Sequence, residues 1–176
     1  MSTPSFDELI TDEYKAQNAA LHDSEPTYGT SGWQYANAVT GLCAEYDTRN
    51  VLDYGCGKGT LADHIPFPIF QYDPAIPEFS RRPSPADIVV CGDVLEHIEP
   101  DCLRNVLLDL HILTRKVAYF VIGTRPAAKT LPDGRNCHLI VQDEPWWRVE
   151  VQNAGFDIYR TSRGRKGEAI FTARPD

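Results

Sequence analysis

The spacing of apolar residues changes near residue 50 and divides the chain into two parts. Before this point the apolar residues recur at helical spacing, which predicts helices over residues 5–22 and 33–46. Ser5 can cap the first helix, with Glu8 three residues on. A turn-rich stretch over residues 23–32 separates the two helices. We expect residues 1–48 to form a helical lid with a hinge in this stretch.

From residue 50 on, short apolar runs alternate with helical patterns, which is typical of an α/β domain built on a parallel sheet. The predicted strands cover residues 50–54, 69–72, 86–91, 116–123, 156–161 and 168–173, and the predicted helices cover residues 60–65, 101–113 and 145–154. No regular pattern covers residues 124–144, and a loop of that length inside a compact domain usually carries function. Residues 49–176 are therefore predicted to form the main domain.

Composition and charge narrow the classes of protein. The chain has 176 residues and a net charge of −8, which disfavours a protein that wraps nucleic acid, because such affinity depends on basic side chains. No apolar run is long enough for a membrane span, and the N-terminus lacks the pattern of a signal peptide, so a soluble cytoplasmic protein is expected. The five cysteines show no C-x-x-C spacing, which indicates neither a disulfide framework nor a metal site.

The most informative motif is the run Val51-Leu-Asp-Tyr-Gly-Cys-Gly-Lys-Gly59, in which an apolar strand leads into three alternating glycines. Glycines at this place let the backbone approach a ligand closely. Thr60 occupies the position of the third glycine of the dinucleotide fingerprint, so a nicotinamide cofactor is disfavoured. Asp53 suits a cationic ammonium group better than a pyrophosphate, and Asp73 is placed to accept hydrogen bonds from a ribose diol.

These motifs resemble those of the class I S-adenosylmethionine-dependent methyltransferases. The matching segments are VLDYGCGKG (51–59), YDPA (72–75), ADIVVCGDVLEHI (86–98), VAYFVIGTR (117–125) and WWRVEVQNAGF (146–156). The resemblance spans about residues 50–176 and implies a Rossmann-like, seven-stranded, mostly parallel sheet with an antiparallel last strand and helices on both faces. One departure is the short segment between Pro74 and Asp87, where the strand that reads the adenine is compressed or missing.

The resemblance also implies site residues. Asp53, Gly55 and Gly57 would lie against the methionine part of S-adenosylmethionine, Asp73 would bind the ribose, and Pro74 would pack beside the adenine. Cys91, Gly92 and Asp93 would line the sulfonium and the methyl group. The implied cofactor-binding residues are thus Asp53, Gly55, Cys56, Gly57, Asp73, Pro74, Cys91, Gly92 and Asp93.

The function implied is methyl transfer to an oxygen or nitrogen of a small molecule, with S-adenosylhomocysteine as the product. His138, His97 and Asp93 are the candidate catalytic residues, and His138 is the leading candidate for a base because a histidine titrates near neutral pH. For Glu96 and His97, support of the loop is an equal alternative to catalysis. Three other functions remain open: methylation of nucleic acid or protein, another reaction of the same cofactor, and a non-catalytic cofactor-binding subunit.

Overall fold

Six strands form one mixed sheet in the computed structural model, which describes residues 8–164 and 167–176. The strands are β1 (Val51–Tyr54), β2 (Phe70–Tyr72), β3 (Ala86–Gly92), β4 (Thr114–Gly123), β5 (Phe156–Arg163) and β6 (Glu168–Pro175). Their order in the sheet is β2-β1-β3-β4-β6-β5, with β1 to β4 parallel to one another and β6 antiparallel to both of its neighbours. This is the α/β architecture that the alternating pattern predicts.

The expectation of seven strands is wrong for the described part of the chain, which contributes six to the sheet. Between β2 and β3 the chain forms only a 3₁₀ turn, η3 (Pro77–Phe79). Proline cannot donate a hydrogen bond to a neighbouring strand, and this segment contains Pro77, Pro83 and Pro85. The sheet therefore ends at β2.

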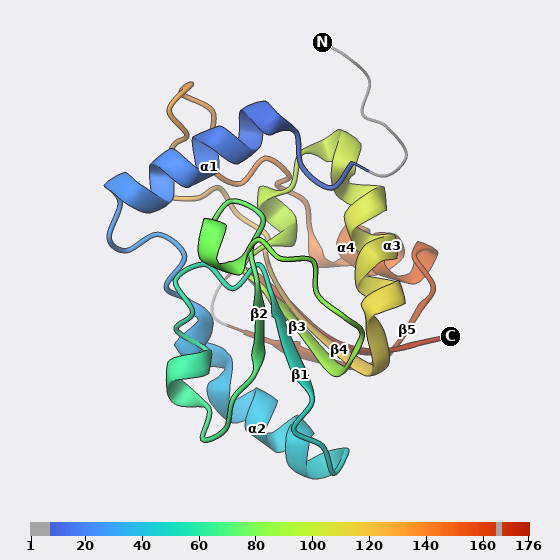
Figure 1. The fold of residues 1–176 in the computed structure, drawn as a ribbon. Coiled ribbons are helices and arrows are strands. Elements are labelled where there is room, and N and C mark those ends of the chain that lie inside the picture. Colours follow the sequence, from blue (N-terminus) through green and yellow to red (C-terminus); the bar gives the residue numbers. More distant parts are fainter. Residues whose placement is uncertain (1–7, 165–166) are drawn as a thin grey trace.

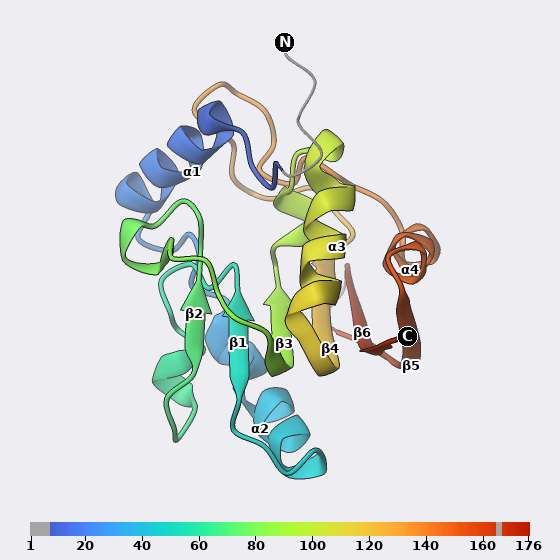
Figure 2. The ribbon, with the colours of Figure 1, turned by 45° about the vertical axis from the view of Figure 1, so that its right-hand side comes forward.

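The described residues also form four α-helices: α1 (Asp12–Ser24), α2 (Ala36–Glu45), α3 (Leu103–Leu113) and α4 (Glu144–Asn153). Short 3₁₀ segments are η1 (Gly32–Tyr35), η2 (Ala62–His64), η4 (Leu95–His97) and η5 (Pro100–Cys102). Figures 1 and 2 show α2 on one face of the sheet and α3 on the other, while α1 crosses beyond the ends of the parallel strands. Within the described ranges, no helix has both the length and the apolar character that a membrane span requires.

Two predicted helices differ from those observed. The first helix begins after Thr11, whose side chain accepts a hydrogen bond from the backbone N–H of Tyr14. The proposed cap Ser5 lies outside the described residues, and residues 8–11 are not helical. The helix predicted over residues 60–65 is reduced to η2, because Pro66 follows too soon for a full helix to develop.

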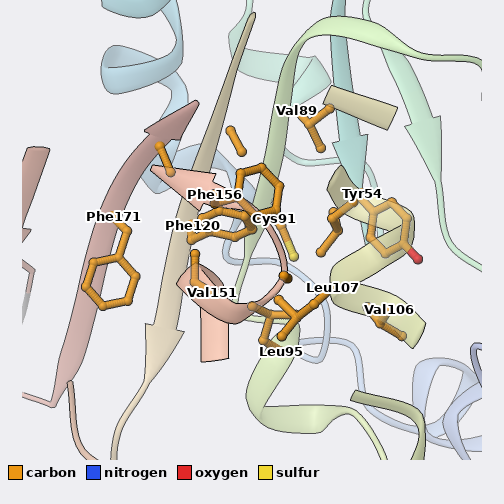
Figure 3. Close-up of a cluster of buried hydrophobic side chains, with 14 of the residues drawn as sticks. Tyr54, Val89, Cys91, Leu95, Val106, Leu107, Phe120, Val151, Phe156 and Phe171 are labelled. Atoms are coloured by element: carbon orange, nitrogen blue, oxygen red, sulfur yellow. The ribbon is translucent and has the colours of Figure 1, made fainter. Parts of the chain in front are cut away.

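The core is divided between the two faces of the sheet by the alternation of side chains along the strands. In β3, Val89 and Cys91 join the cluster under α3 and α4, whereas Ile88 and Val90 join the cluster under α2. Figure 3 shows the first cluster, in which Phe120 of β4 packs edge to face on Phe156. This rigid centre holds the strand ends that carry the loops of the site.

A third, smaller apolar cluster joins α1 to the loop over residues 124–144. Its buried members are Tyr14, Leu21, Leu131 and Cys137. The loop thus has a partner for its apolar side chains and is held against α1 at the carboxyl ends of the strands, as Figure 1 shows. In open α/β sheets, ligands bind outside these strand ends.

Candidate functional site

A cavity of about 440 Å³ lies at the carboxyl ends of the parallel strands. Its walls come from α1, from the glycine loop after β1, from the turns after β2 and β3, and from the 124–144 loop. Seven of the predicted site residues line it: Gly55, Gly57, Asp73, Pro74, Asp93, His97 and His138. The structure therefore brings most of the sequence-derived site to one place.

The glycine loop needs its glycines for two reasons. Gly55 and Gly57 have positive φ angles of 75° and 53°, which are unfavourable for most residues with a side chain. A Cβ atom on Gly57 would lie only 2.5 Å from the carbonyl oxygen of Gly29. The same oxygen accepts a hydrogen bond of 2.8 Å from the backbone N–H of Lys58. The glycine loop and the segment after α1 are thus held together backbone to backbone.

Asp73 is a buried carboxylate at the cavity wall. One of its oxygens accepts the backbone N–H of Gly57 at 3.1 Å, and the other accepts that of Ala75 at 2.9 Å. A carboxylate has about four acceptor sites, so acceptor capacity remains for a ligand. Asp73 therefore both shapes the glycine loop and can receive hydroxyl groups from the cavity.

Asp53 lies in β1 and does not line the cavity. It is buried, and its Oδ2 atom has no hydrogen-bond partner among the described residues. Burial, together with the charge of Asp73, raises the pKa of Asp53 to about 7. A buried carboxylate without a partner is costly, and a nearby cation offsets this cost. This position therefore favours a positively charged ligand group.

Asp93, His97 and His138 form a cluster in which one potential ligand atom from each lies within 4.8 Å of the others. Asp93 directly follows β3, and its positive φ of 61° turns the chain there. Its backbone N–H donates to the carbonyl of Val121, and its carboxylate accepts from the Ser31 hydroxyl at 3.0 Å. The carboxylate is thus fixed at the end of a central strand.

Asn136 holds His138 in place. Its side-chain oxygen accepts the backbone N–H groups of His138 and Ala127, each at 2.9 Å, and its amide donates to the Ala127 carbonyl. The Nδ1 atom of His138 lies 2.6 Å from the carbonyl oxygen of Arg125. Because a carbonyl can only accept, Nδ1 donates and Nε2 keeps its lone pair. That lone pair can accept a proton or bind a cation.

His97 is almost enclosed, and burial lowers its pKa to about 4 against the opposing effect of Asp93. The neutral imidazole therefore predominates near pH 7. Its Nδ1 atom has no partner in the described part of the chain. The hydroxyl of Tyr14 in α1 donates to the backbone carbonyl of His97 at 2.5 Å, which ties this helix to the cluster.

Glu96 supports the loops around the cluster. One side-chain oxygen accepts the backbone N–H of Gly123 at the end of β4, and the Glu96 carbonyl accepts that of Ile140. Burial, followed by the charge of Asp93, raises the pKa of Glu96 well above its usual range. These contacts agree with the supporting role considered for Glu96, which does not line the cavity.

Three other predicted residues lie away from the cavity. Cys91 is completely buried, and its side chain lies in the core among Leu95 and Phe120 (Figure 3). Cys56 is buried as well, and a Cβ atom on Gly92 would meet the ring of Tyr35 at 2.4 Å. The Cys91 side chain cannot line a ligand because the alternation along β3 points it into the core.

The sequence interpretation missed the polar face of α1. Tyr14, Asn18 and His22 all line the cavity, and Asn18 accepts a hydrogen bond of 2.9 Å from the Tyr28 hydroxyl. These three residues are four apart, so they share one face of the helix. That spacing is the sequence feature that could have identified them.

No protein-family model and no curated protein matches this chain. Solved structures do. The 1,6-didemethyltoxoflavin-N1-methyltransferase of Burkholderia thailandensis, with 1,6-didemethyltoxoflavin and S-adenosylhomocysteine bound, is 19% identical over 100% of this chain and 94% of its own, with a TM-score of 0.65.

The magnesium protoporphyrin IX methyltransferase of Synechocystis PCC 6803, with S-adenosylmethionine bound, is 16% identical over 96% of this chain and 100% of its own, with a TM-score of 0.63. The mitomycin 7-O-methyltransferase MmcR is also 16% identical, over 89% of this chain and 60% of its own, with a TM-score of 0.63. At these identities the likeness concerns the fold, and the fold of this chain is that of the S-adenosylmethionine-dependent methyltransferases.

Proposed function

We propose that this protein is a methyltransferase that uses S-adenosylmethionine to methylate an oxygen or nitrogen atom of a small molecule. The observation that carries the proposal is the pair of buried carboxylates beside the glycine loop. Asp53 has an unpaired oxygen, and Asp73 keeps acceptor capacity toward the cavity. These groups suit the two ends of one ligand, a cationic amino acid part and a ribose.

The residues present fit this cofactor. A Cβ atom on Gly55 would collide with the Val94 side chain and one on Gly57 with the Gly29 backbone, so only glycine fits in this loop, whose backbone lines the cavity. In our proposal the glycine loop contacts the methionine part, the buried Asp53 next to this loop supplies a negative charge that favours its ammonium group, Asp73 binds the ribose hydroxyls, and Pro74 packs beside the adenine. When bound, the cofactor supplies a methyl group on a positively charged sulfur.

The chain's own residues position and activate the acceptor. The acceptor atom would take the methyl group that the cofactor supplies and would give up its proton to a basic group of this chain or to water. Alignment of the two reactants supplies a large part of such catalysis. We assign activation of the acceptor to Asp93, His97 and His138, which line the cavity together.

The size of the cavity favours a small acceptor. Its volume is about 440 Å³, within the usual range for sites that hold small molecules. In our proposal the segment before α2 acts as a lid, since Tyr14, Asn18 and His22 of α1 close one side of the cavity. Helix α2, which the expected lid included, packs on the sheet and belongs to the main domain. A polymer substrate would require this side to be open.

Calorimetry with S-adenosylmethionine, S-adenosylhomocysteine and NAD tests the cofactor assignment. We expect binding of the first two and none of NAD, and NAD binding of equal strength would contradict the proposal. Transfer of a tritiated methyl group to separate pools of metabolites, RNA and protein then tests the acceptor class. We expect the label in the metabolite pool. Label found only in RNA or protein would contradict the assignment of a small-molecule acceptor.

A further inference from the structure

Two imidazoles and one carboxylate meet on the acceptor side of the cavity. Asp93 follows β3, His97 belongs to η4, and His138 comes from the 124–144 loop. One potential ligand atom from each side chain lies within 4.8 Å of the others. Two ligands at about 2.1 Å from one metal ion are at most about 4.2 Å apart, so small side-chain rotations would bring all three to an ion.

The hydrogen bonds of the two histidines leave one ring nitrogen of each available. His138 donates from Nδ1 to the Arg125 carbonyl, which leaves the Nε2 lone pair free. His97 has a buried Nδ1 atom without a partner in the regions that the structure describes. Histidines that bind metals characteristically donate their other N–H to a carbonyl or carboxylate, as His138 does.

We propose that Asp93, His97 and His138 hold one divalent transition-metal ion. Two nitrogens and one carboxylate oxygen are a common ligand set for zinc, manganese, iron or cobalt, whereas magnesium and calcium prefer oxygen ligands. Three protein ligands leave coordination positions open. Because all three residues line the cavity, such a position can face the acceptor.

The role of the ion, though not its binding, rests on the proposed function. A divalent ion lowers the pKa of an oxygen ligand by many units, from 15.7 to about 7 for water on zinc in carbonic anhydrase. An acceptor hydroxyl bound there would lose its proton to water near neutral pH and become a better nucleophile for the methyl carbon. In this mechanism His138 is a ligand of the ion and not the base.

The surroundings hold the three ligands in place. The Ser31 hydroxyl donates to the Asp93 carboxylate, and Asn136 fixes the backbone of His138. Glu96 joins the end of β4 to η4 through the Gly123 N–H. These contacts keep the cluster together before any ion binds, which lowers the cost of ordering the ligands.

Cobalt is a suitable probe because its visible absorption reports the ligands directly and requires no substrate. The full chain, free of any histidine tag, is treated with a chelator and titrated with Co²⁺, Zn²⁺ and Mg²⁺ in separate experiments. We expect one Co²⁺ per chain with intense visible bands, displacement of Co²⁺ by Zn²⁺, and binding of Mg²⁺ at least about 100-fold weaker. Absence of the bands, or equal affinity for Mg²⁺, would overturn the proposal.

Variants identify the ligands. His138→Gln, His97→Gln and Asp93→Asn should each weaken Co²⁺ binding at least tenfold, and asparagine tolerates the left-handed backbone of residue 93. His111→Ala is the matched control, because His111 lies on α3 beside Asp176 and away from the cavity. Unchanged Co²⁺ binding in the three cluster variants would show that only adventitious surface binding occurs. Circular dichroism checks that each variant is folded.

A separate measurement distinguishes this inference from the proposed function. Calorimetry of S-adenosylhomocysteine with the chelator-treated chain reports the cofactor site alone. Cofactor binding without Co²⁺ binding would overturn the metal site and leave the methyltransferase in place. Co²⁺ binding at the cluster without cofactor binding would retain the metal site and overturn the proposed function.

Discussion

The imidazole ring of His138 meets that of His97 edge to face, with the ring centroids 4.7 Å apart and the planes at 80°. The two rings come from a loop and from η4, and Asn136 fixes the loop partner through its hydrogen bonds to Ala127 and His138. The relative position of the rings therefore depends on a residue that does not line the cavity.

Asn136→Ala tests this dependence. The loop loses three hydrogen bonds, so His138 should move from its position, and a displacement of about 1 Å can reduce turnover by roughly 100-fold. Methyl-transfer rates should fall about 10- to 100-fold, while calorimetry should find the affinity for S-adenosylhomocysteine unchanged. Asn153→Ala, at the end of α4, is the control. Equal turnover in both variants would show that Asn136 does not position His138.

Asp73→Ala should weaken cofactor binding at least about tenfold, which corresponds to 1.4 kcal/mol. The carboxylate makes charge-assisted hydrogen bonds, which contribute about 1.5–3 kcal/mol each, and it also orders the Gly57 N–H. Calorimetry with S-adenosylhomocysteine measures the loss, and thermal unfolding checks the fold. Asp63→Ala, at an exposed position, should bind normally. If the folded Asp73→Ala variant binds S-adenosylhomocysteine with unchanged affinity, Asp73 does not bind the ribose.

The raised pKa of Asp53 predicts a pH dependence of stability. In the unfolded chain an aspartate titrates near 3.9, whereas in the folded chain the pKa of Asp53 is about 7. The folded state therefore holds more protons between these values, and the free energy of unfolding should fall as the pH rises from about 4 to 7. Urea unfolding at several pH values should show this slope reduced in Asp53→Asn. An identical slope in both proteins would contradict the assignment.

The same residue predicts proton release on binding. A cationic ligand group beside Asp53 favours the ionised carboxylate, so near pH 7 binding of S-adenosylhomocysteine should expel a fraction of a proton from this group. Calorimetry in two buffers of different ionisation enthalpy measures this release. Asp53→Asn should release less, and Asp63→Asn should behave like the unmodified chain. Equal release in all three proteins would mean that another group titrates.

Hydrogen exchange tests the lid. Helix α1 contacts the remainder of the site through the Tyr14 hydroxyl and through a small apolar cluster, and its polar face lines the cavity. Closing segments of this kind become ordered when the ligand binds. Amides of residues 12–28 should gain protection when S-adenosylhomocysteine is added, while those of α3 should not change. Equal protection of α1 in both states would make it a fixed part of the fold.

The core supplies a prediction that is independent of function. Phe120 of β4 is fully buried in the cluster under α3 and α4, so Phe120→Ala should lower the free energy of unfolding by about 3–5 kcal/mol. Val149→Ala removes a side chain that is 51% exposed and should cost much less. Urea unfolding of the two variants makes the comparison. A loss below 1 kcal/mol at Phe120 would indicate that the core is packed differently.

The strand positions could be read from the sequence because buried parallel strands are continuous apolar runs, as β3 and β4 are. The resemblance implied seven strands, but the segment between Pro74 and Asp87, noted in the sequence as too short for the usual strand, forms none. The ends of the predicted helices were less accurate, because each helix end is determined by a single capping residue or proline. Thr11 caps α1, and the short segment before Pro66 has room for one 3₁₀ turn only.

The cofactor side of the site was predictable because Gly55, Gly57 and Asp73 lie in short motifs with a fixed relation to β1 and β2. The cluster of Asp93, His97 and His138 was not predictable as a metal site, because its members come from separate elements and show no ligand spacing. Cys91 was misplaced because the motif identifies a strand end but does not specify which face a side chain occupies.

The backbone contact between Gly29 and Gly57 limits how the cavity can open. The Gly29 carbonyl accepts a hydrogen bond from the Lys58 N–H, and the backbones of Gly29 and Gly57 are too close for a side chain to fit between these two segments. Residue 29 is thus a fixed point of the N-terminal segment. In the lid that we propose, α1 would move relative to this point, and the backbone contact beside the glycine loop would stay in place.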